Sequence, residues 1–442
     1  MFDSVFSKSQ LKPKSFISIV ESVRGIAAVY VVISHLLIFL RAKTYFANDS
    51  IGHYIVSLFY NYGHSAVLLF FIVSGFSIHY TSIDRPLNKR SGVVFYYFLR
   101  LRRIYPVFLL TVAITLAITY IGYILNLIDY KNHFDVISFN QIIWTLLFAT
   151  DRDYIEGIFV ATISTNGPLW SLSYEILYYL LYPLFWKICT KHNIFYALLV
   201  SFLISAVSII YASFISPNHL TNVFSLYILW GLGALLAELK RRDLKITLSP
   251  VFLYLLIYIL FESVWVLEYV RHSMFSIYQL TWGALFFSFM LLFIFKKSIK
   301  SIPTMQKNMV ATVMSIGLLI NLLAPDYLDI TNNRSFYSLK IISTYLILLY
   351  FMYFTKADIV NFIRQILKPF TKLGHISYGL YIIHYPVLVL MSGIIITYKL
   401  PTYTFIIAIA VSFLLAYFLE VKFQHWAANL IDKTIRPHLK NN

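Results

Sequence analysis

The feature of this sequence that most constrains its fold is a succession of apolar stretches, each long enough to cross a bilayer. A helix of about 20 predominantly apolar residues spans the hydrocarbon layer of a membrane. The sequence predicts twelve such spans, at residues 18–40, 62–80, 104–126, 168–187, 194–215, 222–238, 249–268, 274–295, 309–325, 336–354, 375–397 and 402–420. Segment 309–325 and the join at 268–274 are the least distinct, so the pattern is compatible with 10–12 spans.

The overall composition supports the same class. Of the 442 residues, 59% are hydrophobic and only 12% are charged, whereas soluble domains carry about a quarter charged residues. We therefore predict an all-α polytopic membrane protein. The lone Cys189 excludes an internal disulfide framework and a cysteine-based metal cluster, and no metal-binding motif is present, so no metal is expected.

The positive charges are distributed unevenly between the two sides of the predicted membrane. If the N-terminus is inside, 26 Lys and Arg residues fall in inside connections and 8 in outside connections. The positive-inside rule then predicts cytoplasmic N- and C-termini. In this interpretation the net charge of +17 reflects Lys and Arg residues that orient the protein in the membrane. We therefore expect no nucleic-acid partner. We predict a cytoplasmic segment 1–17, a transmembrane domain 18–420 and a cytoplasmic tail 421–442, with no cleaved signal peptide because the first apolar run is too long.

The first predicted span contains two ionisable residues, Arg24 and His35. Ten residues between them correspond to roughly 16 Å along a helix, which puts Arg24 near the cytoplasmic interface and His35 near the bilayer centre. Ionisable groups at that depth usually face partners or a cavity. A snorkelling Arg24 and a hydrogen-bonded core His35 are the structural alternatives. In the functional alternative, a neutral His35 acts as a general base.

Two further motifs place charges at or inside predicted spans. In "FLRLRRIYP", Arg100 and Arg103 share a helix face, and two guanidinium groups on one face suit phosphate oxygens. Arg102 is explained as one of the cytoplasmic basic residues that set the orientation of the span in the membrane. In "GPLWSLSYEILYYLLYP", Glu175 lies one to two turns inside a span, where it is either a structural hydrogen-bonding group or part of a site.

The remaining motifs have structural explanations beside functional ones. Trp170 is explained structurally as a residue of the aromatic belt at the membrane interface, and Ser173 as a polar residue at the start of a helix. Gly75, Gly379 and the glycines of "GLGA" at 231–234 predict close helix approach. Two histidines, His79 and His384, are ionisable groups at or near membrane depth, and His79 fits an interfacial position.

In this order, the motifs resemble those of the acyltransferase family 3 membrane O-acyltransferases. The resemblance is carried by "RGIAAVYVVISH", "FFIVSGF", "RLRRIYP", "WSLSYE" and "ISYGLYIIHYP", between residue 21 and about residue 386. It implies a core of roughly ten or eleven spans, a bacterial inner-membrane location and O-acylation of sugars in surface polysaccharides or related glycans. Some relatives carry a C-terminal extracytoplasmic hydrolase-like domain. This sequence departs from them by ending without one, so we expect a single-module enzyme.

The resemblance also implies roles for individual residues. His35 matches the residue taken as catalytic, Arg24 matches part of the acyl-CoA site, and Arg100 and Arg103 match paired arginines at the same cytoplasmic mouth. We expect Glu175 to partner the imidazolium of His35. Substrate-binding positions are expected at residues that match other family motifs, namely Trp170, Ser173, Ser377 and Tyr378.

The expected reaction moves an acetyl group from cytoplasmic acetyl-CoA to a sugar hydroxyl presented from the far side. The donor, a glycan acceptor and the lipid bilayer are therefore the expected partners. The acidic connection 127–167 and the span mouth at Trp170 are candidate acceptor sites. Direct attack assisted by His35 and transfer through an acyl-His35 intermediate both remain open. A secondary transporter or polysaccharide flippase is the alternative function, although such folds usually show matching halves, which the sequence does not. The sequence gives no indication of an oligomeric state.

Overall fold

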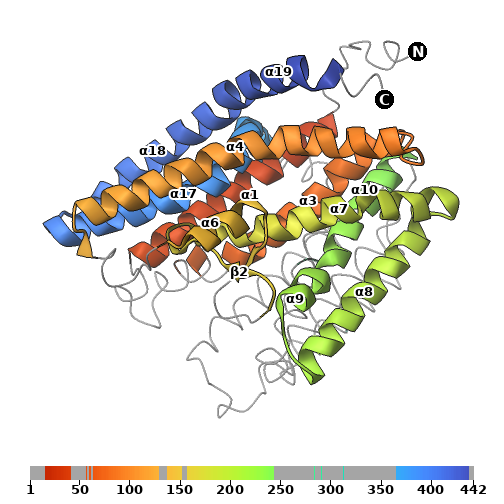
Figure 1. Ribbon diagram of the computed structural model, residues 1–442, viewed down its shortest axis with the longest axis horizontal. Coiled ribbons are helices and arrows are strands. Elements are labelled where there is room, and N and C mark those ends of the chain that lie inside the picture. Colours follow the sequence, from red (N-terminus) through yellow and green to blue (C-terminus); the bar gives the residue numbers. More distant parts are fainter. Residues whose placement is uncertain are drawn as a thin grey trace.

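The computed structural model describes residues 15–40, 63–128, 137–151, 157–242 and 365–437, together with residues 56, 59, 60, 283, 290 and 312 (Figure 1). These ranges are almost wholly helical. The α-helices are α1 (Ser15–Phe39), α3 (Gly63–Ser82), α4 (Arg90–Ile124), α6 (Phe139–Leu146), α7 (Trp170–Lys191), α8 (Ile194–Phe214), α9 (His219–Ser225), α10 (Tyr227–Arg241), α17 (Thr371–Tyr398), α18 (Phe405–Tyr417) and α19 (Gln424–Thr434). Two short strands, β1 (Thr150–Asp151) and β2 (Val160–Ala161), pair in parallel.

Seven helices in the described part of the chain are long and apolar enough to cross a membrane. They are Ile17–Phe39, Gly63–Ser82, Arg90–Ile124, Ile194–Ala212, His219–Arg241, Gln365–Tyr398 and Thr402–Thr434. Each contains or overlaps one predicted span, which confirms the all-α polytopic fold class. The predicted span 168–187 is helix α7, which is not among the seven, and its start carries Ser171, Ser173 and Glu175. The four spans predicted between 249 and 354 lie outside the described residues.

The last long helix continues beyond the end predicted for it. After α18, a π-helical turn η8 (Phe418–Phe423) leads directly into α19, so the chain stays helical to Thr434. The predicted tail 421–442 is therefore helical through most of its described length. A π-helical turn is rare and often marks a functional position, and this one contains the buried Glu420.

Helices α1 and α17 lie side by side and run in the same direction. Ser22 Oγ is 2.9 Å from Thr371 Oγ1, and His35 Nδ1 is 2.8 Å from His384 Nε2. Both contacts join residues 349 apart in the sequence, so the two helices stay in register over this length. Gly374 permits the close approach, because a Cβ atom there would lie 2.1 Å from the carbonyl oxygen of Glu21.

A second layer consists of α3, α7 and α10. A Cβ atom on Gly75 would lie 2.0 Å from the Trp230 carbonyl oxygen, and one on Gly233 would lie 1.9 Å from that of Ile72. The close helix approach predicted for Gly75 is therefore confirmed, and of the two "GLGA" glycines it is confirmed for Gly233. Aromatic side chains fill the space beside this contact, with Tyr178, Tyr182 and Trp230 almost fully buried.

Three prolines inside helices explain several of the polar contacts between helices. A proline has no N–H and leaves the carbonyl four residues earlier without its helical donor. Side chains from other segments supply the missing donors. The Arg102 carbonyl, four residues before Pro106, accepts from Gln424 Nε2 over 2.9 Å. The Tyr179 carbonyl, before Pro183, accepts from Tyr96 Oη over 3.2 Å, and the Ile382 carbonyl, before Pro386, accepts from Asn166 Nδ2 over 3.0 Å. The prolines thus create acceptors that tie the bundle together.

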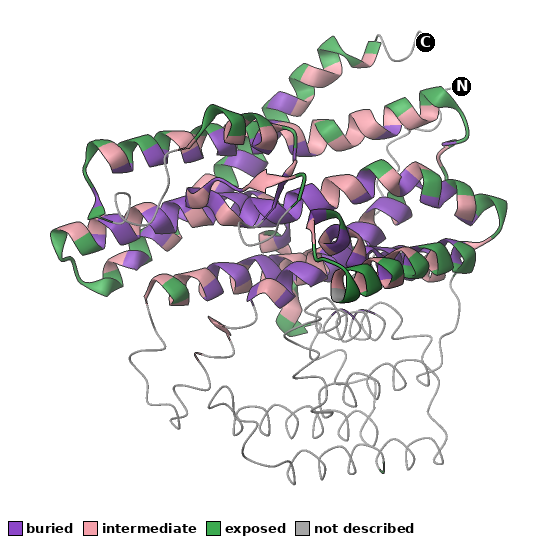
Figure 2. Cartoon of the chain, turned by 60° about the horizontal axis from the view of Figure 1, so that its bottom comes forward, coloured by how far each residue is buried: buried purple, intermediate pink, exposed green. Residues whose placement is uncertain are grey.

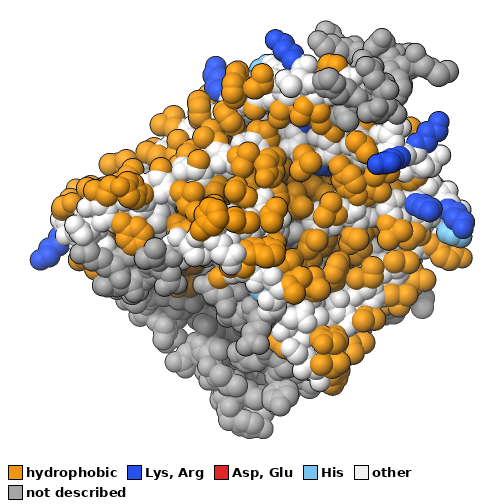
Figure 3. All heavy atoms as spheres, in the orientation of Figure 1, with side chains coloured by type: hydrophobic (Ala, Val, Ile, Leu, Met, Phe, Trp, Pro, Cys, Tyr) orange, Lys and Arg blue, Asp and Glu red, His pale blue; other side chains and the backbone are white. Residues whose placement is uncertain are grey.

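Apolar side chains cover much of the face that Figure 3 shows, and Figure 2 shows which parts of the helices are exposed. Helix α8 exposes Phe195, Phe202 and Ile210, and α18 exposes Ile406 and Leu414, which is 69% exposed. Large contiguous apolar surfaces are unusual on soluble monomers. On a bundle with seven potential spans, such surfaces fit contact with lipid.

The described cations gather at the end where α1 and α17 begin and where α3 and α10 end. Only Lys399, at the C-terminal end of α17, lies at the opposite end among the Lys and Arg residues that the structure describes. In Figure 3, blue side chains lie mainly along the upper and right-hand margins. This asymmetry agrees with the positive-inside pattern, and the assignment of the basic end to the cytoplasm stays a prediction.

Candidate functional site

A cavity of about 160 Å³ lies between helices α1, α3, α4, α7 and α17. Five residues selected from the sequence line it: Arg24, Arg100, Arg103, Glu175 and Tyr378. They come from four helices and span more than 350 residues of sequence. The shared helix face predicted for Arg100 and Arg103 is confirmed, since both reach the same cavity.

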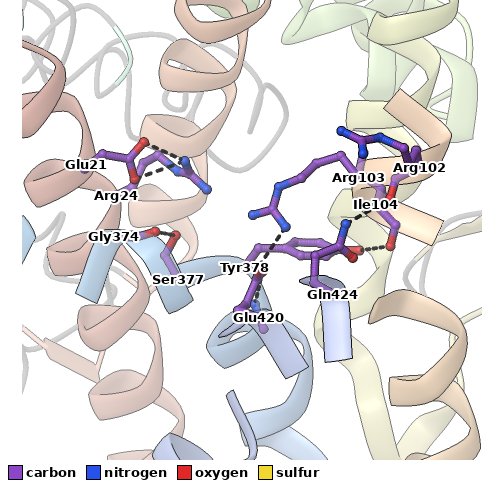
Figure 4. Close-up of polar contacts among 11 residues, drawn as sticks. Glu21, Arg24, Arg102, Arg103, Ile104, Gly374, Ser377, Tyr378, Glu420 and Gln424 are labelled. Atoms are coloured by element: carbon purple, nitrogen blue, oxygen red, sulfur yellow. Dashed lines mark hydrogen bonds and ion pairs between the residues drawn. The ribbon is translucent and has the colours of Figure 1, made fainter. Parts of the chain in front are cut away.

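Arg103 is held by a buried carboxylate on the π-helical turn. Its Nη1 atom donates to Glu420 Oε2 over 2.7 Å, and the other carboxylate oxygen, Oε1, accepts the Gly379 N–H over 3.1 Å (Figure 4). The Arg103 guanidinium also lies 6.0 Å from the ring centre of Tyr378, whose hydroxyl donates to Ile104 O. A cation held between a carboxylate and an aromatic ring keeps a fixed position.

Arg24 reaches the cavity from α1. Its Nη1 lies 3.2 and 3.3 Å from the two carboxylate oxygens of Glu21, one helical turn earlier. Figure 4 shows the Arg24 and Arg103 head groups on facing sides of the same space, with Glu21 on the far side of Arg24 and Glu420 below Arg103. About a quarter of the Arg24 side chain is solvent-exposed, so this cation is accessible.

Arg100 has hydroxyl partners in place of a carboxylate. Its Nη2 atom donates to Thr81 Oγ1 and Ser82 Oγ, both at 3.1 Å, at the C-terminal end of α3. The guanidinium also lies 5.4 Å from the ring centre of Tyr96. On the turn after α3, burial and the positive charge of Arg100 lower the pKa of Arg85. Arg100 and its basic neighbour make this side of the cavity attractive to anions.

Glu175 is the acidic residue that lines the cavity. Its Oε1 accepts a hydrogen bond from the Tyr179 hydroxyl, and Tyr179 in turn accepts one from Ser74 Oγ over 3.2 Å. Ser74 and Tyr179 also line the cavity. The structure therefore connects Glu175 to Tyr179, whereas the ring bonded to His35 is that of His384.

His35 does not line the cavity and is separated from it by the side chains of Tyr381 and His384. The cavity wall includes Tyr381, whose ring centre is 6.2 Å from that of His384. The hydroxyl of Tyr381 is 2.8 Å from Ser171 Oγ and donates to Pro168 O over 3.1 Å. The His384 ring lies edge to edge with that of His35, with ring centres 5.1 Å apart and planes inclined by 11°. Tyr381 thus stands between the cationic cavity and the histidine pair.

Trp170, Ser173 and Ser377 are not among the residues that line the cavity. The Trp170 ring stacks on His64 with centres 5.0 Å apart. Ser173 is fully buried and accepts the Thr150 N–H over 3.2 Å, which holds strand β1 against α7. Ser377 Oγ donates to the Gly374 carbonyl within its own helix over 2.7 Å.

Two features of the site were not selected from the sequence. Glu420 is a lone carboxylate inside a long apolar helix, and the same criterion that identified Glu175 applies to it. His384 was noted as an ionisable group at membrane depth, but its pairing with His35 depends on the register between α1 and α17. No local pattern in the sequence encodes that register.

Comparison with protein-family models gives a match to the acyltransferase domain over residues 17–308. The comparisons with curated proteins and with solved structures gave no match. The matched range contains Arg24, His35, Arg100, Arg103 and Glu175 and covers more than half of the chain. It ends before α17, which the contacts described above bring against α1. By this match, the chain belongs to the acyltransferase family 3 of multi-pass membrane proteins.

Proposed function

We propose that the protein is an O-acyltransferase that moves an acetyl group from acetyl-CoA to a sugar hydroxyl of a surface polysaccharide or lipid-linked glycan. We place it in a bacterial inner membrane with its basic end in the cytoplasm. The observation that carries the proposal is the convergence of Arg24, Arg100 and Arg103 on one cavity, whose wall residue Tyr381 neighbours His384 of the His35–His384 pair. Family membership favours this enzyme over a transporter or flippase.

The three guanidinium groups fit the chemistry of the proposed donor. Coenzyme A carries phosphates that are too costly to bury in hydrocarbon, and guanidinium groups bind phosphate oxygens through paired hydrogen bonds. A cavity of 160 Å³ is smaller than the ~300–1,000 Å³ of typical ligand pockets. We therefore assign only part of the donor to it, with the thin thioester arm reaching past Tyr381 toward His35.

We propose direct transfer as the reaction route. Nε2 of His35 accepts the proton of the acceptor hydroxyl while the hydroxyl oxygen bonds to the thioester carbon. The carbon–sulfur bond then breaks, and the departing thiolate takes the proton from His35 and leaves as CoA. The alternative passes through an acyl-His35 intermediate. Release of one CoA per protein molecule in the absence of acceptor would favour that alternative.

The other selected residues receive different roles in this proposal. Glu175 acts from the cavity side, where it fixes the hydroxyl of Tyr179 near the donor. Tyr378 shapes the wall beside Arg103. Ser173 and Ser377 support the substrate sites through their backbone hydrogen bonds. Trp170, stacked on His64, is the proposed contact for the acceptor sugar.

Mass spectrometry of surface glycans tests the function. Cells that carry the wild-type protein should yield glycan with a mass increment of one acetyl group, and fragmentation should locate it on a hydroxyl. Replacement of His35 by Ala should remove the increment while unmodified glycan still reaches the surface, with protein level checked in membranes. Loss of surface glycan itself would indicate export and refute the proposal.

A further inference from the structure

The ring of His384 makes two hydrogen bonds that together define where its proton lies. Its Nδ1 atom is 3.0 Å from the carbonyl oxygen of Leu380, and its Nε2 atom is 2.8 Å from His35 Nδ1. A carbonyl oxygen can only accept a hydrogen bond, so Nδ1 of His384 carries the proton. In a neutral imidazole the other nitrogen is then an acceptor.

The state of His35 follows from that of His384. Because Nε2 of His384 is an acceptor, Nδ1 of His35 must donate to it. A neutral His35 then has its lone pair on Nε2, the atom that would remove a proton from an attacking hydroxyl. His384 is fully buried in the described structure, and a charged imidazole is costly away from water, which supports a neutral ring there.

The surroundings hold the pair in this geometry. The two rings lie edge to edge and nearly parallel, with planes inclined by 11°. The ring of Tyr385 meets His35 edge-on, with centres 5.0 Å apart and planes inclined by 84°. The Leu380 carbonyl belongs to the same helix as His384, so this acceptor cannot move independently of it. The in-register contact of α1 and α17, set at Ser22 and Thr371 on the preceding turns, brings the two rings together.

From this geometry we infer that His384 is a positioning residue for His35, which keeps the proton of His35 on Nδ1 and leaves Nε2 as the base. This inference rests on the proposed function, because it assigns a chemical task to His35. After His35 takes up the hydroxyl proton, the same hydrogen bond to His384 steadies the imidazolium until the proton passes to the departing thiolate. In hydrolases, loss of the neighbouring acceptor that holds a catalytic His in the correct tautomer lowers kcat by orders of magnitude.

Two substitutions at the same position test the inference. His384→Leu keeps a buried apolar side chain but removes the acceptor, and His384→Gln keeps an acceptor oxygen near the position of Nε2. Turnover is measured with radiolabelled acetyl-CoA in membranes that contain their own glycan, and CoA binding is measured by calorimetry on the purified protein. We expect His384→Leu to lower kcat on the order of 100-fold, the lower range of general-base contributions. CoA affinity should change by less than about twofold, and His384→Gln should retain most of the wild-type kcat.

A spectroscopic measurement separates this inference from the proposed function. In protein labelled with ¹⁵N-histidine, the His35 signals are identified by their loss in His35→Gln. They should show a protonated Nδ1 and a bare Nε2 in the wild type and in His384→Gln, and a shift toward the Nε2-protonated form in His384→Leu. If His35 keeps one tautomer in all three proteins, or if His384→Leu turns over like the wild type, the inference is wrong while acyl transfer stands. If the wild type shows the expected tautomer but transfers no acetyl group, the proposed function fails instead.

Discussion

Glu420 joins Arg103 to the backbone of α17 at Gly379. One carboxylate oxygen accepts from the Arg103 guanidinium over 2.7 Å and the other accepts the Gly379 N–H over 3.1 Å. A Cβ atom at residue 379 would lie 3.0 Å from Glu420 Cγ and 3.2 Å from the Ala416 carbonyl oxygen. The glycine of "ISYGLY" therefore allows the carboxylate to reach the helix and to hold the cation at the cavity.

Substitution of Gly379 by Ala should push the Glu420 side chain away and loosen Arg103. Overpacking of this kind costs about 1–3 kcal/mol, which exceeds the roughly 1 kcal/mol gained by placing Ala in a helix. We expect a lower midpoint of thermal unfolding in detergent and weaker CoA binding. Gly231→Ala is the matched control, because its Cβ would meet only side-chain atoms at 3.3 Å or more. Equal midpoints for the two variants would contradict this account.

The spans that the structure describes were largely predictable from the sequence because a bilayer requires about 20 apolar residues per helix. Their ends were less predictable. Helix α4 begins at Arg90, well before the apolar run at 104, because helix formation continues through the polar interface. Glu420 and Lys422 interrupt the apolar pattern near 420, yet the backbone stays helical through the π turn.

The candidate site was predictable in its residue types and only partly in its contacts. Spacing alone placed Arg100 and Arg103 on one face, because residues three apart are neighbours on a helix. The partners of Arg103 and His35 are Glu420 and His384, each more than 300 residues away in the sequence. Such pairs depend on how helices pack, and a single sequence contains no periodic signal for that packing.

Tyr96 and Pro183 should be energetically coupled, because the tyrosine hydroxyl donates to the Tyr179 carbonyl that Pro183 leaves without a helical donor. Tyr96→Phe should destabilise the protein by about 1–3 kcal/mol, the cost of a buried unsatisfied group. In a Pro183→Ala background, the new N–H supplies the donor, and the same change should cost much less. A double-mutant cycle of unfolding free energies measures the difference.

Tyr97→Phe is the matched control for that cycle. The Tyr97 hydroxyl donates to the next carbonyl, that of Leu180, over 2.8 Å in a more exposed position. The residue four positions after Leu180 is Leu184, which has an N–H to donate. We therefore expect Tyr97→Phe to be nearly neutral and insensitive to Pro183→Ala. Purely additive effects for Tyr96→Phe and Pro183→Ala would show that the hydroxyl does not replace the missing donor.

Two adjacent residues of α17, Ser377 and Tyr378, should differ in their effect on donor binding. Within the described part of the chain, Ser377 hydrogen-bonds to Gly374 of its own helix, whereas Tyr378 lines the cavity beside Arg103. Calorimetry should find the CoA affinity of Ser377→Ala within about twofold of the wild type. Tyr378→Leu should bind CoA several-fold more weakly, since it removes a cation–π contact of about 0.5–2 kcal/mol. A larger effect from Ser377→Ala would place that serine in the donor site after all.

The arginines of "RLRR" should separate into a donor-binding pair and a structural residue. Arg100 and Arg103 line the cavity, whereas Arg102 pairs with Asp432 of α19 over 2.6 Å. Arg100→Gln and Arg103→Gln should each weaken CoA binding by about 10- to 100-fold, as expected for loss of a charged hydrogen bond of 1.5–3 kcal/mol. Their affinity for pantetheine, which has no phosphate, should not change.

Arg102→Gln removes the same charge from the same helix and should leave CoA binding intact while lowering the unfolding midpoint slightly, because its ion pair is partly exposed. Comparing the affinities for CoA and pantetheine distinguishes a loss of phosphate contacts from a general loss of folding. A loss of folding would weaken the binding of both ligands. A loss of CoA binding in Arg102→Gln as large as that in Arg103→Gln would mean that basic charge near the mouth, and not the geometry of the cavity, attracts the donor.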